Sequence, residues 1–375
     1  MTIREWFNIF CSLGYVLFTA TTSTLTLLVP AIVLRLISTS LYSRVTSGIF
    51  ACWWTSCLFI TETLNGIKVR VTGDALPDGV PLLFMSNHKC NLDWMFLWSA
   101  AIRTGSLWNV GLFRAVAKAE IRVIPIFGWG CKLNGFAYVK RRWDRDKAHM
   151  TRWIRAQIAR AASGWVLIFP EGTRYTDANK KRIAASCEKR GVTPLPGEIL
   201  QPRTKGLALL LAESKAAAGF EDTGGYFGGV VDMTVAYTDA NGVPLSGSAL
   251  GTRCFGQLMK GHIPVHTCHV HFKCFAPSEV PAGVEEIDAW CLERWREKAK
   301  LLEGIAKDGR VLGTQPWSTS GGRVPPVLQG LLRVGFVSQG LVCVALLVSY
   351  KAFALYALCA LVGVGIVAHV DQAEW

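Results

Sequence analysis

Both ends of this chain are far more apolar than its middle, and this uneven distribution limits the fold more than any other feature. Residues 6–34 carry no charge, and a helix needs only about 20 predominantly apolar residues to cross a hydrocarbon core. A second uncharged run, residues 45–61, is marginal in length, and its Trp53 and Trp54 favour the membrane–water interface. We therefore predict an N-terminal membrane hairpin over residues 1–62, which either crosses the bilayer or dips into one leaflet.

The C-terminal end carries two further apolar runs, residues 334–350 and 352–370, separated by Lys351. They predict C-terminal membrane helices within residues 327–375, either as two helices joined by a tight turn or as one bent element. A cleaved signal peptide is not expected, because the first apolar run is longer than a signal core and no small-residue cleavage site clearly follows it. These segments together predict an integral membrane protein.

The middle of the chain alternates between helical and strand-like patterns, which is typical of an α/β fold. The strand at residues 81–85 is an unbroken apolar run and is expected to be buried on both faces. We expect an α/β domain over residues 63–320, with a mixed sheet flanked by helices. The predicted strands are residues 67–72, 81–85, 135–139, 165–169, 231–237 and 269–275, and the predicted helices are residues 93–102, 147–162 and 285–306.

The chain is strongly basic, since 40 Lys and Arg residues face 27 Asp and Glu residues and give a net charge of +13. Such a charge suits a phospholipid surface, a nucleotide-bearing cofactor or nucleic acid. The apolar ends favour lipid, and no recognised nucleic-acid-binding module is present. The 12 cysteines are scattered without a C-x-x-C pair, which indicates reduced thiols on a cytosolic face rather than a disulfide framework or a zinc ribbon.

His88 and Asp93 are the first candidate for chemistry, because they follow directly after the predicted strand 81–85. A turn entering a helix brings two positions five residues apart to about 7–8 Å between α-carbons, so the side chains can touch. Asp93 then fixes one imidazole nitrogen and leaves the other to accept a proton from a hydroxyl. The alternative is that Asp93 only caps the helix and His88 is an ordinary loop histidine.

Three further stretches place cations where strands end or helices begin. In residues 169–174, Gly172 allows a close backbone approach, Thr173 can donate a hydrogen bond, and Arg174 offers a planar fork for a phosphate. Residues 135–142 form a short strand that ends in Lys140 and Arg141, and residues 202–206 place cations beside a helix start. The alternatives are an ordinary turn for the first, a solvated basic face for the second, and a grip on the membrane surface for the third.

In this order and with these spacings, the four stretches resemble the glycerolipid acyltransferase family, in its branch of 1-acylglycerol-3-phosphate acyltransferases. His88 and Asp93 match the family's His-x4-Asp box, and Glu171 to Arg174 match its Glu-Gly-Thr-Arg box identically. Residues 135–141 match a Gly-x-x-Phe-x-x-Arg-like box, with Tyr in place of Phe, and residues 202–206 are similar to a run in the eukaryotic branch. The resemblance covers roughly residues 64–302. One departure is that residues 228–234 lack the proline that usually precedes the family's later apolar strand.

The resemblance implies acyl transfer from acyl-CoA to the free sn-2 hydroxyl of 1-acylglycerol-3-phosphate, which gives phosphatidic acid. His88 would deprotonate the hydroxyl, and Asp93 would orient His88 and stabilise its imidazolium. Arg174, helped by Arg141, would hold the phosphate, and Glu171 would set either the glycerol backbone or the loop. A thioester is already activated, so no enzyme nucleophile is needed, and the chain has no G-x-S-x-G motif. The predicted substrate-binding set is Glu171, Gly172, Thr173, Arg174, Arg141 and Lys140.

Acyl-CoA is therefore expected as a co-substrate, with no permanently bound cofactor and no metal. The expected partners are the bilayer and its lysophosphatidic acid, without nucleic acid and without an obligate protein partner. The family's usual home is the endoplasmic reticulum, with the catalytic domain facing the cytosol. Two alternatives stay open: a remodelling acyltransferase that uses lysocardiolipin or lysophosphatidylinositol, and a non-catalytic lipid-binding scaffold. The histidines of residues 266–274 are not expected to bind a metal, because strand alternation places His269 and His271 on one face and Cys274 on the other.

Overall fold

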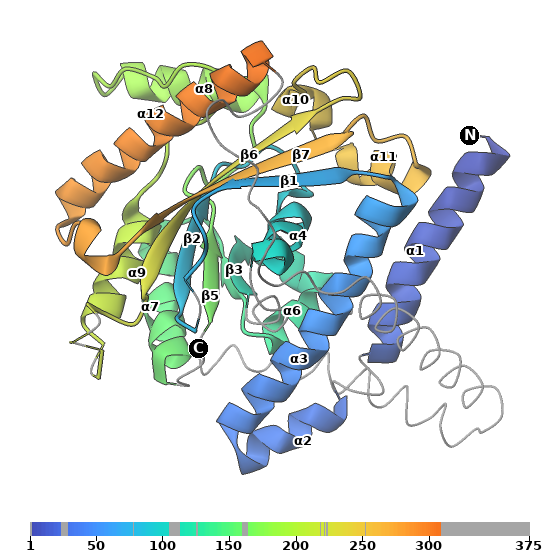
Figure 1. Ribbon diagram of the computed structural model, residues 1–375. Coiled ribbons are helices and arrows are strands. Elements are labelled where there is room, and N and C mark those ends of the chain that lie inside the picture. Colours follow the sequence, from blue (N-terminus) through green and yellow to red (C-terminus); the bar gives the residue numbers. More distant parts are fainter. Residues whose placement is uncertain are drawn as a thin grey trace.

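A seven-stranded mixed sheet forms the centre of the protein (Figure 1). The computed structural model describes residues 2–23, 29–77, 79–104, 113–124, 127–159, 164–217, 219, 220, 222, 224–251 and 253–308. The strands are β1 (Lys68–Gly73), β2 (Leu82–Ser86), β3 (Phe113–Lys118), β4 (Ala137–Val139), β5 (Trp165–Ile168), β6 (Gly229–Thr238) and β7 (Thr267–Phe275).

The sheet has the strand order β1-β7-β6-β2-β5-β3-β4. Strands β6, β2, β5, β3 and β4 run parallel to one another, whereas β7 is antiparallel to β6 and β1 is parallel to β7. The carboxyl ends of the five parallel strands therefore lie at one edge of the sheet, which is where open α/β sheets place their ligands.

Helices cover both faces of the sheet. The helices are α1 (Ile3–Ser23), α2 (Val29–Ile37), α3 (Thr39–Leu58), α4 (Asp93–Thr104), α6 (Phe127–Leu133), α7 (Trp143–Ala159), α8 (Asp177–Glu188), α9 (Lys205–Lys215), α10 (Gly247–Leu250), α11 (Cys254–Lys260) and α12 (Val284–Asp308). Figure 1 shows α7, α9 and α12 on one side of the sheet and α3, α4 and α6 on the other. A π-helical turn, residues Phe59–Leu64, and two short 3₁₀ turns, Ala119–Val123 and Pro277–Glu279, complete the described elements.

Strand β2 shows how the two faces of the sheet are filled. Leu82 and Phe84 pack in the core beneath α3 and α4, while Leu83 and Met85 pack in the core beneath α7, α9 and α12. All five residues of β2 are buried, so the prediction of a strand buried on both faces is confirmed. This strand delivers the chain into the loop that contains His88.

The predicted α/β class with a mixed sheet is confirmed, and each of the six predicted strands is present with ends shifted by at most a few residues. The three predicted helices correspond to α4, α7 and α12. The helix start expected beside residues 202–206 corresponds to α9, whereas the sequence does not predict strand β3 or helices α6, α8, α10 and α11. The domain boundaries stay a prediction, and the C-terminal runs at residues 334–350 and 352–370 lie outside the described residues.

The prediction of an N-terminal helix that crosses the bilayer is wrong for the residues that the structure describes. None of the described helices combines the length and the apolar character that a membrane crossing requires. Within the uncharged run at residues 6–34, the structure describes α1 as far as Ser23 and α2 from Val29 onward, and the alternative of a hairpin in one leaflet stays a prediction. Threonines and serines make the end of α1 more polar than a spanning helix.

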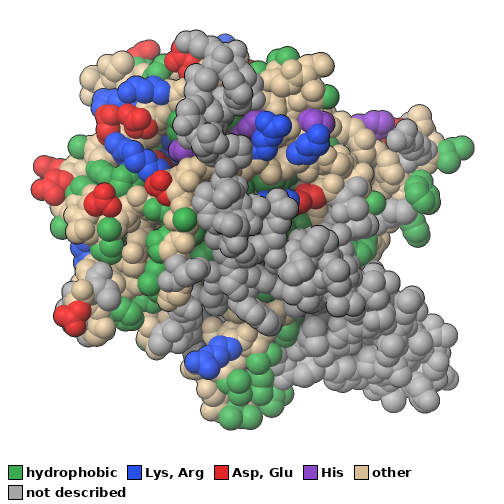
Figure 2. All heavy atoms as spheres, viewed as in Figure 1, with side chains coloured by type: hydrophobic (Ala, Val, Ile, Leu, Met, Phe, Trp, Pro, Cys, Tyr) green, Lys and Arg blue, Asp and Glu red, His purple; other side chains and the backbone are tan. Residues whose placement is uncertain are grey.

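The outer edge of the sheet is basic. Lys68 and Arg70 of β1 are exposed, and Figure 2 shows Lys, Arg and His side chains across this face. His271 contacts Thr72 at 3.0 Å and His269 contacts Thr238 at 3.2 Å, and the described residues contain no group of metal ligands. Exposed cations on an edge strand oppose pairing with a second sheet.

Gly73, at the end of β1, provides a test of how closely β1 packs against β7. Gly73 has a φ of 95°, and a Cβ atom built there would lie 1.9 Å from the carbonyl oxygen of Phe272. We expect Gly73→Ala to lower the free energy of unfolding by about 3 kcal/mol or more, because it adds this clash to the strain of a left-handed backbone. Chemical denaturation followed by tryptophan fluorescence measures the change.

Gly66→Ala is the matched control, since Gly66 also has a positive φ, 65°, but has open space around its Cβ position. Its cost should be only about 1–2 kcal/mol. Equal losses in the two variants would contradict the packing of β1 against β7.

Candidate active site

The loop after β2 folds back on itself around the carboxylate of Asp93. Nδ1 of His88 lies 2.8 Å from Oδ2 of Asp93, and the backbone N–H groups of Lys89 and Cys90 donate to the same carboxylate at 2.7 and 3.1 Å. The hydroxyl of Tyr237, on β6, donates to Oδ1 at 2.5 Å. The predicted contact between His88 and Asp93 is therefore present, and the backbone donors to this carboxylate come from the loop before α4, which begins at Asp93.

Asp93 is completely buried, whereas the side chain of His88 is 19% exposed. A buried carboxylate is costly unless donors surround it, and here five donors do so, including the thiol of Cys90. Burial, and then the negative charge of Asp93, raise the pKa of Tyr237 well above its usual range. The tyrosine therefore stays a hydrogen-bond donor, and Asp93 is held in one orientation.

The imidazole of His88 is fixed on its other sides as well. The ring stacks on Phe169 with 4.2 Å between the ring centroids. The backbone carbonyl oxygen of His88 accepts from the backbone N–H of Tyr175 at 2.7 Å. The preceding Asn87 exchanges two hydrogen bonds with the backbone of Val235 on β6. With Nδ1 occupied by Asp93, the second imidazole nitrogen is the one left to exchange a proton with a substrate.

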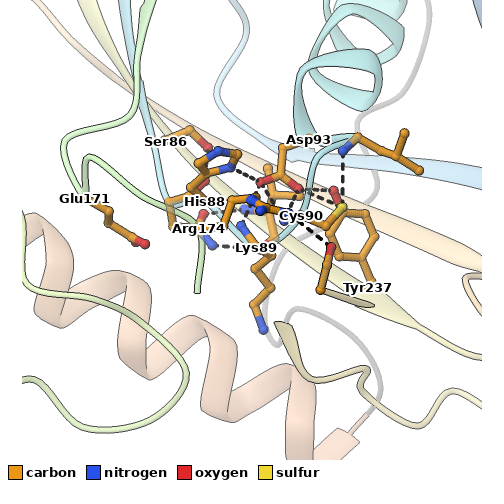
Figure 3. A network of polar contacts seen from close by, with 12 residues as sticks. Ser86, His88, Lys89, Cys90, Asp93, Glu171, Arg174 and Tyr237 are labelled. Atoms are coloured by element: carbon orange, nitrogen blue, oxygen red, sulfur yellow. Dashed lines mark hydrogen bonds and ion pairs between the residues drawn. The ribbon is translucent and has the colours of Figure 1, made fainter. Parts of the chain in front are cut away.

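The turn after β5 places residues 171–174 beside this loop, because β2 and β5 are neighbouring parallel strands. Gly172 has a φ of 67° at the turn. The hydroxyl of Thr173 accepts from Asn179 at 3.3 Å, and the guanidinium of Arg174 donates to the carbonyl of Gly251 at 3.3 Å. Figure 3 shows Arg174 close to the cluster around Asp93.

Arg141, Arg174 and Arg203 form a group of three guanidiniums. Burial lowers the pKa of Arg141, Glu120 raises it, and the positive charges of Arg203 and Arg174 lower it further. The side chain of Arg203 lies beside Gly172, where a Cβ atom would be 3.7 Å from its Cδ. The charges of Arg174 and Arg203 are therefore near enough to act on that of Arg141, and a group of three guanidiniums suits a multiply charged anion.

The backbone at Arg141 is held in an unusual conformation. Arg141 has a φ of 61°, and no other described residue except glycine has a positive φ. The buried carboxylate of Asp146 accepts from the N–H of Lys140 at 2.9 Å and from that of Arg142 at 2.8 Å, on either side of it. Such a conformation costs roughly 1–3 kcal/mol and persists only where the surroundings impose it. Asp146 therefore directs Arg141, while the side chain of the predicted Lys140 is exposed.

Glu171 lies apart from the cluster around Asp93, next to α12 (Figure 3). It is 1% exposed, and its Oε1 accepts from the indole N–H of Trp295 at 3.2 Å. Burial raises its pKa to about 8, although the N–H of Trp295, the backbone N–H of His88 and the charge of Lys298 oppose this rise. A direct contact between Glu171 and a substrate stays a prediction.

Lys89 points away from Asp93 and connects the loop to a different part of the chain. Its Nζ forms an ion pair of 2.9 Å with Glu198, which also accepts from the N–H of Gly247 at 3.3 Å. The segment between β6 and β7, which contains α10 and α11, is thereby tied to the loop of His88.

Comparison with known proteins identifies the family of this chain. A family model described as Acyltransferase matches residues 68–237. Lysocardiolipin acyltransferase 1 of Danio rerio is 31% identical over 293 residues, which is 78% of this chain and 70% of that protein. The chain therefore belongs to the acyltransferase family, as the motifs indicate.

Two further similarities accompany these. The probable 1-acyl-sn-glycerol-3-phosphate acyltransferase 5 of Arabidopsis thaliana is 29% identical over 280 residues, which is 74% of this chain and 68% of that protein. A crystal structure of the 1-acyl-sn-glycerophosphate (LPA) acyltransferase PlsC from Thermotoga maritima aligns with 80% of this chain and 98% of that one, at a TM-score of 0.46 and 16% identity.

Tyr237 and Arg203 extend the site that the motifs predict. The sequence predicts cations beside a helix start at residues 202–206, and α9 begins at Lys205. It does not predict that the side chain of Arg203 lies beside Gly172. Tyr237 carries no local signal, since it is 144 residues from Asp93 along the chain.

Removal of the Tyr237 hydroxyl tests whether Asp93 needs all its donors. We expect Tyr237→Phe to slow acyl transfer by about tenfold, because a freer carboxylate orients the imidazole less well. Tyr42→Phe is the control, since the buried hydroxyl of Tyr42 donates to the carbonyl of Leu133 instead. Initial rates at saturating substrate give the comparison, and equal rates in the two variants would contradict a role for Tyr237.

Proposed function

We propose that this protein transfers an acyl chain from acyl-CoA to the free sn-2 hydroxyl of 1-acylglycerol-3-phosphate and so produces phosphatidic acid. The observation that carries the proposal is the pairing of His88 with the buried Asp93 beside a group of three guanidiniums. The first provides a general base for a hydroxyl, and the second provides a site for a phosphate. A non-catalytic lipid-binding scaffold would need neither in combination.

In the proposed reaction, His88 takes the proton from the lysophospholipid hydroxyl as its oxygen attacks the thioester carbonyl. Asp93 keeps the imidazole oriented and stabilises the imidazolium that forms. The imidazolium then returns the proton to the departing CoA thiolate as the carbon–sulfur bond breaks. Proton transfer of this kind contributes about 10²–10⁴-fold to the rate.

A phosphate monoester is the acceptor group that fits the charges of the site best. It carries close to two negative charges at neutral pH, and Arg174, Arg141 and Arg203 supply three positive charges. Each phosphate of a lysocardiolipin is a diester with a single charge. The second candidate is nevertheless lysocardiolipin, because the relative that is 31% identical is named a lysocardiolipin acyltransferase.

The bilayer is the proposed location of the acceptor, reached through the N-terminal helices. Ile3, Trp6, Phe7 and Phe10 of α1 are 90%, 60%, 66% and 77% exposed, at the spacing of one helical face. Such a face suits a helix that lies in the membrane interface rather than across it. We propose membrane association with the catalytic domain in the cytosol, at the endoplasmic reticulum.

A panel of acceptors tests the proposal. Purified protein with labelled acyl-CoA and a set of lysophospholipids should convert 1-acylglycerol-3-phosphate to phosphatidic acid, with the products read by mass spectrometry. Preference for lysocardiolipin would select the second candidate. No transfer to any acceptor would refute both.

Replacement of the proposed base should abolish transfer without unfolding the protein. We expect His88→Ala to lose at least about 10²-fold in rate, while the protein stays folded, at a somewhat lower thermal stability because Asp93 loses one donor, and keeps its detergent-requiring association with membranes. His266→Ala is a control outside the site. Near-normal turnover by His88→Ala would remove His88 from the mechanism.

The third guanidinium should act on binding of the acceptor. We expect Arg203→Ala to raise KM for 1-acylglycerol-3-phosphate by about tenfold, since a charge-assisted contact to phosphate is lost. Arg296→Ala removes the same charge from an exposed ion pair on α12 and should leave KM unchanged. A loss in kcat alone, with KM unaltered, would contradict the assignment of Arg203 to the phosphate.

A further inference from the structure

Helix α12 contacts the turn of Glu171 from outside the part of the chain that the family model matches. That match ends at residue 237, whereas Trp295 is 124 residues beyond Glu171 along the chain and donates its indole N–H to Glu171 Oε1 at 3.2 Å. Both side chains are buried, at 0% and 1% exposure. The contact therefore joins a late helix to the turn that carries Arg174.

A second buried contact fixes where Trp295 lies. Lys298, one helical turn later, forms an ion pair with Asp232 of β6 and donates to the carbonyl of Met233. Met233 is paired in register with Ser86 of β2, two residues before His88. Removal of one partner of a buried pair is strongly destabilising, so this pair holds α12 on the strand next to that of the proposed base.

The carboxyl group of Glu171 has few hydrogen-bond donors besides Trp295. Its Oε2 is buried without a hydrogen-bond partner among the described residues, so the indole N–H of Trp295 is the side-chain donor to this carboxyl, and the backbone N–H of His88 is the other donor that favours its ionised form. An unpaired buried carboxylate is costly, and the neutral acid is favoured instead. The side chain has one anchor on α12, and its backbone begins the turn that presents Arg174.

We propose that Trp295 is a positioning residue for acyl transfer, which holds Glu171 and thereby keeps the phosphate-binding turn at a fixed distance from His88. This inference rests on the proposed function of the site. Trp295 touches Glu171 and not the reacting atoms, so it acts through the turn. Its expected effect is on binding of the acceptor phosphate rather than on the proton transfer by His88.

The protonation of Glu171 gives a readout that does not depend on catalysis. Burial raises the pKa of Glu171 to about 8, whereas the Trp295 N–H, the His88 backbone N–H and the Lys298 charge lower it and the Asp93 charge raises it. Glu171 is therefore neutral below about pH 8 and ionises above it. Loss of the indole donor removes a group that favours the ionised form, so the pKa must rise further. The titratable or charged groups that act on Glu171 are Asp93, Lys180 and Lys298, and His88 acts through its backbone N–H.

The experiment compares Trp295→Phe with Trp54→Phe in the full-length protein. Trp54 is also completely buried, but its indole nitrogen has no hydrogen-bond partner among the described residues, so the same ring is reduced without loss of a donor. Infrared difference spectra follow the carbonyl band of the protonated carboxyl as pH rises, and Glu171→Gln identifies the band by its disappearance. We expect a midpoint near pH 8 in the unaltered protein, a higher midpoint in Trp295→Phe, and no change in Trp54→Phe.

Kinetics provide the second arm. Trp295→Phe should raise KM for 1-acylglycerol-3-phosphate by about tenfold and leave kcat within about twofold, since a misplaced turn weakens phosphate binding. An unmoved midpoint in Trp295→Phe, or equal shifts in both variants, overturns the inference, and so does an unchanged KM. If the unaltered protein transfers no acyl group, the proposed function fails while the infrared arm still decides whether Trp295 holds Glu171.

Discussion

The carboxylate of Asp93 is the group on which the site depends. A buried charge persists only where donors surround it, and this one collects donors from three directions: the imidazole of His88, the backbone of the loop, and the hydroxyl of Tyr237. To supply them, the chain must reverse directly after β2 and begin α4 at Asp93. The same contacts that satisfy the carboxylate therefore aim the imidazole, and the requirement of folding becomes a requirement of the proposed chemistry.

The sheet brings the second half of the site to this carboxylate. Strands β2 and β5 are parallel neighbours, so the His88 loop and the turn of residues 171–174 leave the sheet at the same edge. Arg141 arrives from β4, farther along this edge, in a left-handed conformation imposed by Asp146. Local strain at that point is consistent with a functional position, since it is maintained by a buried carboxylate rather than relieved. The result places the proposed base, Arg174 and Arg141 at one edge of the sheet.

The sequence was sufficient for the parts of the structure that have a local cause. The apolar run at residues 81–85 predicted a buried strand, and the spacing of His88 and Asp93 predicted their contact. The alternation in residues 269–275 correctly placed His269 and His271 on one face. Strand β3 is not predicted from the sequence, because Arg114 and Lys118 interrupt its apolar pattern. The contacts of Tyr237 with Asp93 and of Trp295 with Glu171 could not be predicted for another reason. Each joins residues more than a hundred positions apart, and only the tertiary structure brings them together. Lack of charge in residues 6–34 is a weaker signal, because the threonines and serines near the end of α1 lower its apolar character, and none of the described helices has the length and apolar character of a membrane span.

The most direct test of the central claim is a structure of the protein with 1-acylglycerol-3-phosphate and a non-reactive thioether analogue of acyl-CoA. The sn-2 hydroxyl oxygen should lie within about 2.6–3.2 Å of the His88 nitrogen that does not contact Asp93, with the phosphate against Arg174. An acceptor bound with its hydroxyl away from His88, or with its phosphate remote from the three guanidiniums, would contradict the claim that this imidazole is the base.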